Sequence, residues 1–169
     1  MRFFVSLFLS LALLLMGCHS SKKAERKQKH KTERSTGKAV PKDVNKVIKT
    51  ALTYEGTKYK YGGITKKGID CSGLMYVSFK EAGIELPRSS YEQSKSFKAI
   101  KLSEVQKGDL VFFATGNDKN KISHVGLVIE VSKAKDIYFI HATTQRGVCK
   151  DWLSQEYYKE RYVKAVRVL

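Results

Sequence analysis

The stretch Gly68-Ile69-Asp70-Cys71-Ser72-Gly73 leads into a segment whose apolar residues suit a helix that is covered on most sides. These apolar residues are Leu74, Met75, Val77, Phe79 and Ala82. The pattern predicts a mostly buried helix that begins at Cys71 and stops at Gly83. Asp70 is well suited to cap this helix, because a carboxylate accepts hydrogen bonds from the free N–H groups of the first turn. The rest of the chain must cover a helix of this kind, which places it at the centre of the predicted fold.

The thiol of Cys71 is predicted to lie at the positive end of that helix, beside backbone N–H groups that have no partner within the helix. Both features favour the thiolate, whereas a thiol with the ordinary pKa of about 8.5 is a poor nucleophile at neutral pH. We therefore expect the pKa of Cys71 to be lowered. Alternatively, Cys71 is only a small apolar residue in a buried helix, since free cysteines are among the most buried residues.

Residues 1–17 have the pattern of an export signal, in which Arg2 precedes an apolar run that is too short for a comfortable membrane span. The run leads to Leu15-Met16-Gly17-Cys18, which resembles a bacterial lipobox and implies that Cys18 is lipidated and becomes the mature N-terminus. The alternative is a plain secretory peptide or an anchor helix with an incidental cysteine. We expect an exported, membrane-anchored lipoprotein that faces the periplasm, with the outer membrane favoured over the inner one.

Positive charge is concentrated directly after this signal. Residues 19–49 carry 11 Lys and Arg against three acidic residues, so their net charge is +8, half of the +16 of the whole chain. Almost no apolar residue precedes Val40, so residues 18–41 are predicted to be a flexible basic tether. The tether would be drawn to anionic headgroups or wall polymers, or it serves equally well as a solvated spacer. Nucleic acid is not an expected partner, because an exported protein seldom meets it.

Residues 42–169 are predicted to form one folded domain, in which helical apolar spacing comes first and β-branched segments come later. Residues 56–69 are rich in glycine and turn formers and are predicted to be a loop. The order of the segments predicts an α+β fold with helices packed on an antiparallel sheet. The expected helices are 42–54, 71–82 and a short one capped by Ser89 or Ser90, and the expected strands are 110–113, 123–131, 137–142, 147–150 and 162–168.

Two cysteines remain besides Cys18, namely Cys71 and Cys149. In an oxidising compartment, a disulfide between them is the default expectation. However, Cys149 follows Gly147 and Val148 in a segment that resembles a strand, where a small apolar side chain fits. We therefore predict that Cys149 is a core residue.

Two histidines occupy strand ends. His124 opens one predicted strand and His141 closes the next, so the two residues face each other if the strands pair through the turn at 132–136. With the Cys71 helix packed on that sheet, His124 would hydrogen-bond Cys71 and exchange its proton, and His141 would hold His124 in one tautomer. Acyl transfer also needs donors for an oxyanion, for which the Cys71 backbone N–H and the Tyr59 hydroxyl are candidates.

The same histidines have two other interpretations. One is a pair of half-buried sheet histidines without a catalytic role. The other is a zinc site in which Cys71, His124 and His141 are three ligands and water is the fourth. The chain contains no close ligand pair such as Cys-x-x-Cys or His-Glu-x-x-His, so we expect no metal and no other cofactor.

Six motifs resemble those of a known family and occur in its order. They are Gly56–Gly63, Gly68–Leu74, Leu86–Gln93, Gly108–Phe113, His124–Leu127 and Phe139–Ala142. Together they make residues 46–168 similar to the NlpC family of bacterial cell-wall cysteine endopeptidases, which have a compact papain-like fold. With the lipobox in front, the chain resembles the small lipoprotein members of the MepS type.

The resemblance implies roles for individual residues. Cys71 would be the nucleophile, His124 the base and His141 the third polar residue, while Tyr59 would assist at the oxyanion. Asp70, Ser72 and Arg88 match positions that bind substrate in relatives. The competing interpretations are that Asp70 is only an N-cap and Arg88 only a surface charge beside a proline turn.

The function that the resemblance implies is a monomeric peptidoglycan endopeptidase. It would hydrolyse stem-peptide or cross-link amide bonds through a Cys71 acyl-enzyme, and the resemblance favours the D-alanyl to diaminopimelate cross-link. Two alternatives come from other classes of protein. The first is a catalytically silent module that binds wall peptides, and the second is a thiol acyltransferase of a related fold.

Overall fold

The structure is a computed structural model that describes residues 41–169. The predicted signal peptide, Cys18 and the predicted tether as far as residue 40 lie outside the described residues. Among residues 41–169, no helix has the length and apolar character that crossing a membrane requires.

The helices of the first half of the domain follow the predicted pattern. Helix α1 spans Lys42–Leu52 and buries Val44, Val47 and Ala51. Helix α2 spans Cys71–Lys80 and is mostly buried, and α3 spans Ser90–Lys95 with Ser89 as its N-cap. All three predicted helices are therefore confirmed, with α1 and α2 each two residues shorter than expected at the C-terminal end. A short 3-10 helix, η1 (Leu102–Glu104), and helix α4 (Glu156–Arg161) were not predicted.

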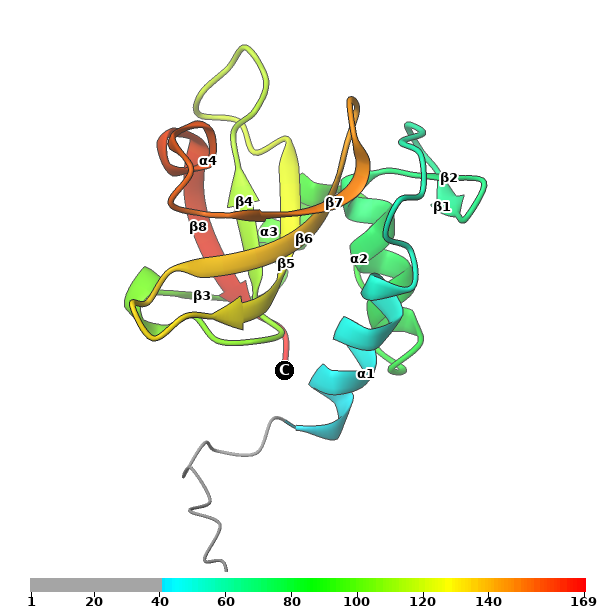
Figure 1. Cartoon of the computed structure of the whole chain (residues 1–169), viewed down its shortest axis with the longest axis horizontal. Coiled ribbons are helices and arrows are strands. Elements are labelled where there is room, and N and C mark those ends of the chain that lie inside the picture. Colours follow the sequence, from blue (N-terminus) through cyan, green and yellow to red (C-terminus); the bar gives the residue numbers. More distant parts are fainter. Residues whose placement is uncertain (1–40) are drawn as a thin grey trace, which may run out of the picture. The chain divides into compact units, whose positions relative to one another are not determined.

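The strands form a six-stranded antiparallel sheet in the order β3-β8-β4-β5-β6-β7 (Figure 1). Their bounds are β3 Lys98–Ile100, β4 Leu110–Phe113, β5 His124–Val131, β6 Ile137–Thr143, β7 Gly147–Trp152 and β8 Tyr162–Arg167. A separate hairpin pairs β1 (Ile64–Thr65) with β2 (Gly68–Ile69), inside the segment that we expected to be a loop. Two segments of the sheet were not predicted, namely the last two residues of β7 and the whole of β3. Each is short and lacks an alternation strong enough to predict a strand.

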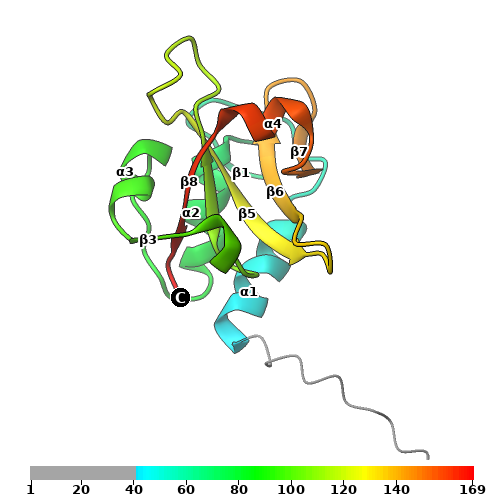
Figure 2. The ribbon, with the colours of Figure 1, turned by 90° about the vertical axis from the view of Figure 1, so that its left-hand side faces the viewer.

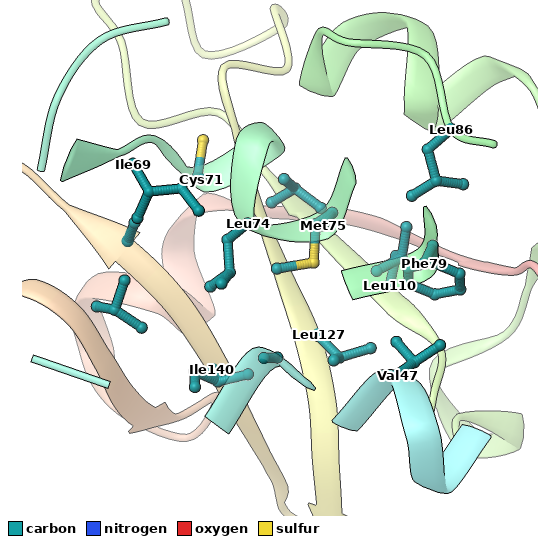
Figure 3. Close-up of a cluster of buried hydrophobic side chains, with 14 of the residues drawn as sticks. Val47, Ile69, Cys71, Leu74, Met75, Phe79, Leu86, Leu110, Leu127 and Ile140 are labelled. Carbon is teal, nitrogen blue, oxygen red and sulfur yellow. The ribbon is translucent and has the colours of Figure 1, made fainter. Parts of the chain in front are cut away.

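Both faces of the sheet are covered, which explains why Leu110-Val111-Phe112-Phe113 is apolar throughout. On one face, Leu110, Leu127 and Ile140 belong to the cluster that α1 and α2 complete (Figure 3). On the other face, Val111, Phe113 and Phe139 pack with Leu153 and with Tyr158 of α4. Figure 1 shows α1 and α2 to the right of the sheet and α4 to its left, and Figure 2 gives the view from the α4 side. Alternate residues of each strand therefore serve two separate hydrophobic cores.

Candidate active site

The predicted nucleophile lies at the first turn of α2, where local chemistry holds the backbone firmly. Asp70 caps the helix through Oδ1, which accepts a 2.6 Å hydrogen bond from the Gly73 N–H. The sulfur of Cys71 points away from the hydrophobic cluster that includes Ile69 and Leu74 (Figure 3). It lines a cavity of about 490 Å³ together with Tyr59 and His124, among other residues.

The predicted lowering of the Cys71 pKa is wrong, because desolvation outweighs the helix N-terminus. Burial raises the pKa of Cys71 to about 11, although N–H groups of Val125 and of the helix start oppose the shift. Burial and, to a smaller extent, the neighbouring His141 together lower the pKa of His124 to about 3. The resting pair at neutral pH is therefore a neutral thiol and a neutral imidazole.

The two predicted histidines meet as expected. His124 Nε2 lies 2.8 Å from His141 Nδ1, and both side chains are buried. They occupy the sheet face that carries Phe139 and Tyr158, and His141 packs against both of those rings. Because His141 engages Nε2, the Nδ1 atom is the ring nitrogen of His124 that remains for the thiol.

The predicted hydrogen bond between Cys71 and His124 is not among those formed within residues 41–169. The two residues instead line the same cavity, and the backbone N–H of Val125, the residue after His124, lowers the pKa of Cys71 against the effect of burial. Catalytic hydrogen bonds are often long in ligand-free sites and tighten when substrate binds. The site therefore brings the thiol beside the base without joining them at rest.

Asp151 continues the row of hydrogen-bonded side chains formed by His124 and His141, and it was not predicted from the sequence. Its Oδ2 atom lies 2.8 Å from His141 Nε2 and accepts a 3.0 Å hydrogen bond from the Tyr158 hydroxyl. Arg146 forms an ion pair with the same carboxylate. The available signal was strand parity: in β7, Cys149 lies opposite His141, and Asp151 is two residues further along on the same face. Because the strand was predicted to end at Lys150, Asp151 was not recognised as a residue of the same sheet face.

The pKa shifts of Asp151 and His141 indicate which of the two side chains is charged. Although burial opposes it, hydrogen bonds from His141, Arg146 and Tyr158 hold the pKa of Asp151 well below its usual range. Burial lowers the pKa of His141, against the opposing effect of Asp151. The pair is therefore a carboxylate and a neutral imidazole at neutral pH.

The prediction that Cys149 is a core residue is wrong. Its side chain is half-buried, and its sulfur lies 3.6 Å from His141 Nε2 and 4.0 Å from Asp151 Oδ2. Neither Cys149 nor Cys71 forms a disulfide within the described residues. A small side chain is needed at position 149 because it faces a polar network rather than the hydrophobic core.

The possible ligand atoms of His141, Cys149 and Asp151 lie close enough together to hold a metal ion. This is a different set from the predicted alternative of Cys71, His124 and His141. The Asp151 carboxylate already accepts from a guanidinium, a phenol and an imidazole, so a cation would have to displace Arg146. The donor set is saturated by hydrogen bonds and therefore suits a proton network better than a metal.

The Tyr59 side chain, predicted to donate to an oxyanion, lies on the wall of the cavity that Cys71 lines. Burial, the Cys71 sulfur and Asp70 raise the pKa of Tyr59, so its hydroxyl keeps its proton. That hydroxyl has no hydrogen-bond partner within residues 41–169. It is therefore able to donate to a ligand.

The predicted substrate-binding residues come together in one cluster on the other side of the helix start. Arg88 binds both oxygens of Asp70, at 2.9 and 2.6 Å, and the Ser72 hydroxyl at 3.0 Å. The Gly62 N–H also donates to Asp70, at 2.7 Å. Asp70, Ser72 and Arg88 are not among the residues that line the 490 Å³ cavity. Their contacts hold α2 in place, and their role in substrate binding stays a prediction.

A thiol at the start of a buried helix, beside a hydrogen-bonded histidine pair on an antiparallel sheet, defines a site of the cysteine-nucleophile class. Residues 56–167 match the NlpC/P60 family, so this chain belongs to the NlpC/P60 family. The predicted family and the predicted α+β fold are thereby confirmed.

Individual relatives agree with this assignment. The chain is 40% identical over 126 residues to the Escherichia coli K12 protein named murein DD-endopeptidase MepS/murein LD-carboxypeptidase, covering 74% of this chain and 63% of that protein. It is 35% identical over 169 residues to the probable endopeptidase NlpC of the same organism, covering 99% of this chain and 100% of that protein. A crystal structure of an NlpC/P60 family protein from Bacillus cereus superposes with a TM-score of 0.68 at 33% identity, covering 75% of this chain and 40% of that one. This chain thus spans 63% of the length of its MepS relative.

Proposed function

We propose that this protein is a cysteine endopeptidase that hydrolyses amide bonds in peptidoglycan peptides. The observation that carries the proposal is the placement of Cys71 and His124 on one cavity, with His141 hydrogen-bonded behind His124. A nucleophile, a base and an orienting residue in this order are the parts that acyl transfer needs. Membership of the NlpC/P60 family and the printed names of the relatives point to murein as the substrate.

The chemistry follows from the neutral resting pair. His124 Nδ1 takes the proton of Cys71 as the sulfur attacks the scissile carbonyl carbon. The Cys71 N–H and the Tyr59 hydroxyl donate to the developing oxyanion. The protonated His124 then passes its proton to the leaving amine, which leaves a thioester on Cys71. Water, deprotonated by His124, releases the acyl group and restores the thiol.

Among peptidoglycan bonds, we propose the D-alanyl to diaminopimelate cross-link as the preferred target. The support is the sequence resemblance to the MepS type, whose E. coli member is named a murein DD-endopeptidase. An acyltransferase acting on lipids is disfavoured, because much of the cavity wall is polar. Its polar lining residues include Thr115, Ser123, Thr143, Thr144, Gln145 and Arg146.

The test is incubation of the protein with purified, defined muropeptides, followed by mass spectrometry of the products. The wild type is expected to cleave them, and Cys71→Ala to lose turnover by at least about 10³-fold because the nucleophile is gone. Cys149→Ser is the matched control: it removes the other described thiol and is expected to keep turnover within about tenfold.

Two results would contradict the proposal. If the wild type binds muropeptides and leaves them intact, the protein is the silent wall-peptide-binding module. If a folded Cys149→Ser protein loses as much turnover as Cys71→Ala, the nucleophile has been misassigned.

We also propose that the chain is exported, lipidated on Cys18 and held as a monomer at a membrane facing the periplasm, with the outer membrane favoured. The support is the apolar run of residues 1–17 and the lipobox-like Leu15–Cys18. Mass spectrometry of the mature N-terminal peptide should find a lipid on Cys18 in the wild type. An unmodified Cys18 within an uncleaved chain would exclude the anchor.

A further inference from the structure

We propose that Asp151 is a positioning residue that sets the direction of the hydrogen bonds through His141 and His124. In doing so, it makes His124 Nδ1, the ring nitrogen that His141 leaves free, a proton acceptor. The inference deepens the proposed function and rests on it, because the acceptor matters only if Cys71 must lose its proton to His124.

The first step is the ionised state of Asp151. The carboxylate is buried, with 5% of its surface exposed. Its oxygens face the guanidinium of Arg146 and the hydroxyl of Tyr158, both of which donate. An ionised carboxylate can only accept hydrogen bonds, so the 2.8 Å contact with His141 requires a proton on Nε2 of that ring.

The second step passes this direction to the next ring. His141 is fully buried and neutral, and a neutral imidazole carries one N–H, so its Nδ1 must be bare. The 2.8 Å contact between His141 Nδ1 and His124 Nε2 then needs a proton on His124 Nε2. His124 is neutral too, which leaves its Nδ1 bare and basic. One fixed acceptor at Asp151 therefore determines the tautomers of both histidines.

The third step is what happens without that acceptor. His141 can then carry its proton on Nδ1 and donate to His124 Nε2, which forces the His124 proton onto Nδ1. In this reversed state, His124 Nδ1, the nitrogen that His141 leaves free, is already protonated and cannot act as a base. The Asp151 charge also stabilises the imidazolium that His124 forms during attack, although two hydrogen bonds separate them.

A second buried aspartate provides a matched control. Asp109 is 2% exposed and binds Arg167 through two 2.9 Å contacts, much as Asp151 binds Arg146. It also accepts from the N–H of Gln106, and no histidine contacts it within the described residues. Asp109→Ala therefore removes a buried ion pair without touching the histidines.

The experiment compares Asp151→Ala with Asp109→Ala on muropeptide turnover and on nitrogen-15 NMR spectra of the imidazole rings. Asp151→Ala removes the acceptor, and the Tyr158 hydroxyl, 3.5 Å from His141 Nε2, can then donate to that nitrogen and favour the reversed state. We expect kcat to fall by about 10² to 10⁴-fold, with KM changed less than about threefold. Asp109→Ala should keep kcat within about threefold. The NMR spectra should show protonated Nε2 on both histidines of the wild type and protonated Nδ1 in Asp151→Ala.

The outcomes separate this inference from the proposed function. A wild type with a proton on Nδ1 of His141 overturns the inference, even if no variant folds. A loss of kcat with unchanged ring protonation in Asp151→Ala also overturns it, because Asp151 would then not act by setting the tautomers. A wild type that cleaves no muropeptide but has the expected ring protons removes the proposed function and supports the tautomer assignment.

Discussion

At the scale of single residues, two opposing effects act on the Cys71 sulfur. The helix start offers N–H groups that favour a thiolate, and burial favours the neutral thiol. Burial is the larger effect, so the pKa rises to about 11. The Cys71 sulfur is therefore a neutral thiol at neutral pH, and the proposed mechanism needs His124 to take its proton during attack.

The neutral burial of His124 predicts how stability depends on pH. An unfolded histidine takes up a proton near pH 6.5, whereas the folded one does so only near pH 3. Between these values the unfolded state binds more protons, so the free energy of unfolding decreases as the pH falls. Between pH 7 and pH 5, His124 alone should remove about 2 kcal/mol.

Urea unfolding at these two pH values measures the effect. His124→Gln lacks the titrating ring and should lose about 2 kcal/mol less than the wild type over the same interval. Equal losses in the two proteins would mean that His124 is not buried in its neutral form.

At the scale of elements, the start of α2 depends on a close approach to the segment before β1. A Cβ atom added to Gly73 would lie 2.2 Å from the backbone oxygen of Gly63, which only a glycine avoids. Arg88 reinforces the same approach by donating to that oxygen at 3.2 Å. The glycine after Cys71-Ser72 therefore has a packing reason that is separate from any helix propensity.

Gly73→Ala should accordingly destabilise the protein by about 2 kcal/mol or more, because backbone atoms must move apart. Ser78→Ala is the control on the same helix. The Ser78 hydroxyl is buried and has no hydrogen-bond partner within the described residues, so its removal should be neutral or stabilising. Chemical unfolding measures both variants. Equal destabilisation of the two would contradict the packing argument.

At the scale of the whole described domain, the site forms where the two cores of the sheet meet. Cys71 belongs to the cluster on the α1 and α2 side, whereas His141 packs against Phe139 and Tyr158 on the α4 side. His124 lies at the first position of β5, at the end of the sheet, and reaches the cavity that Cys71 lines. Rigid elements on both faces therefore hold the proposed nucleophile and the proposed base, and packing preserves their geometry.

The local features of this protein could be predicted from sequence because each depends on neighbouring residues. Asp70 caps α2 three residues from its partner Gly73, and Ser89 does the same for α3. Apolar periodicity is also local, so it located α1 and the long strands and gave the α+β class. Six short motifs, among them Gly68–Leu74 and the two that contain His124 and His141, indicated the family that the match over residues 56–167 confirms.

Tertiary structure alone decided the rest. The pKa of Cys71 depends on how much water distant segments exclude, and no short-range signal measures that. The link from His141 to Asp151 depends on the register of β6 and β7 and on an arginine and a tyrosine that reach the same carboxylate. Cys149 faces that carboxylate, rather than the core, for the same reason. A residue's own neighbours determine its local conformation, whereas its protonation and its partners depend on segments that only the folded chain brings together.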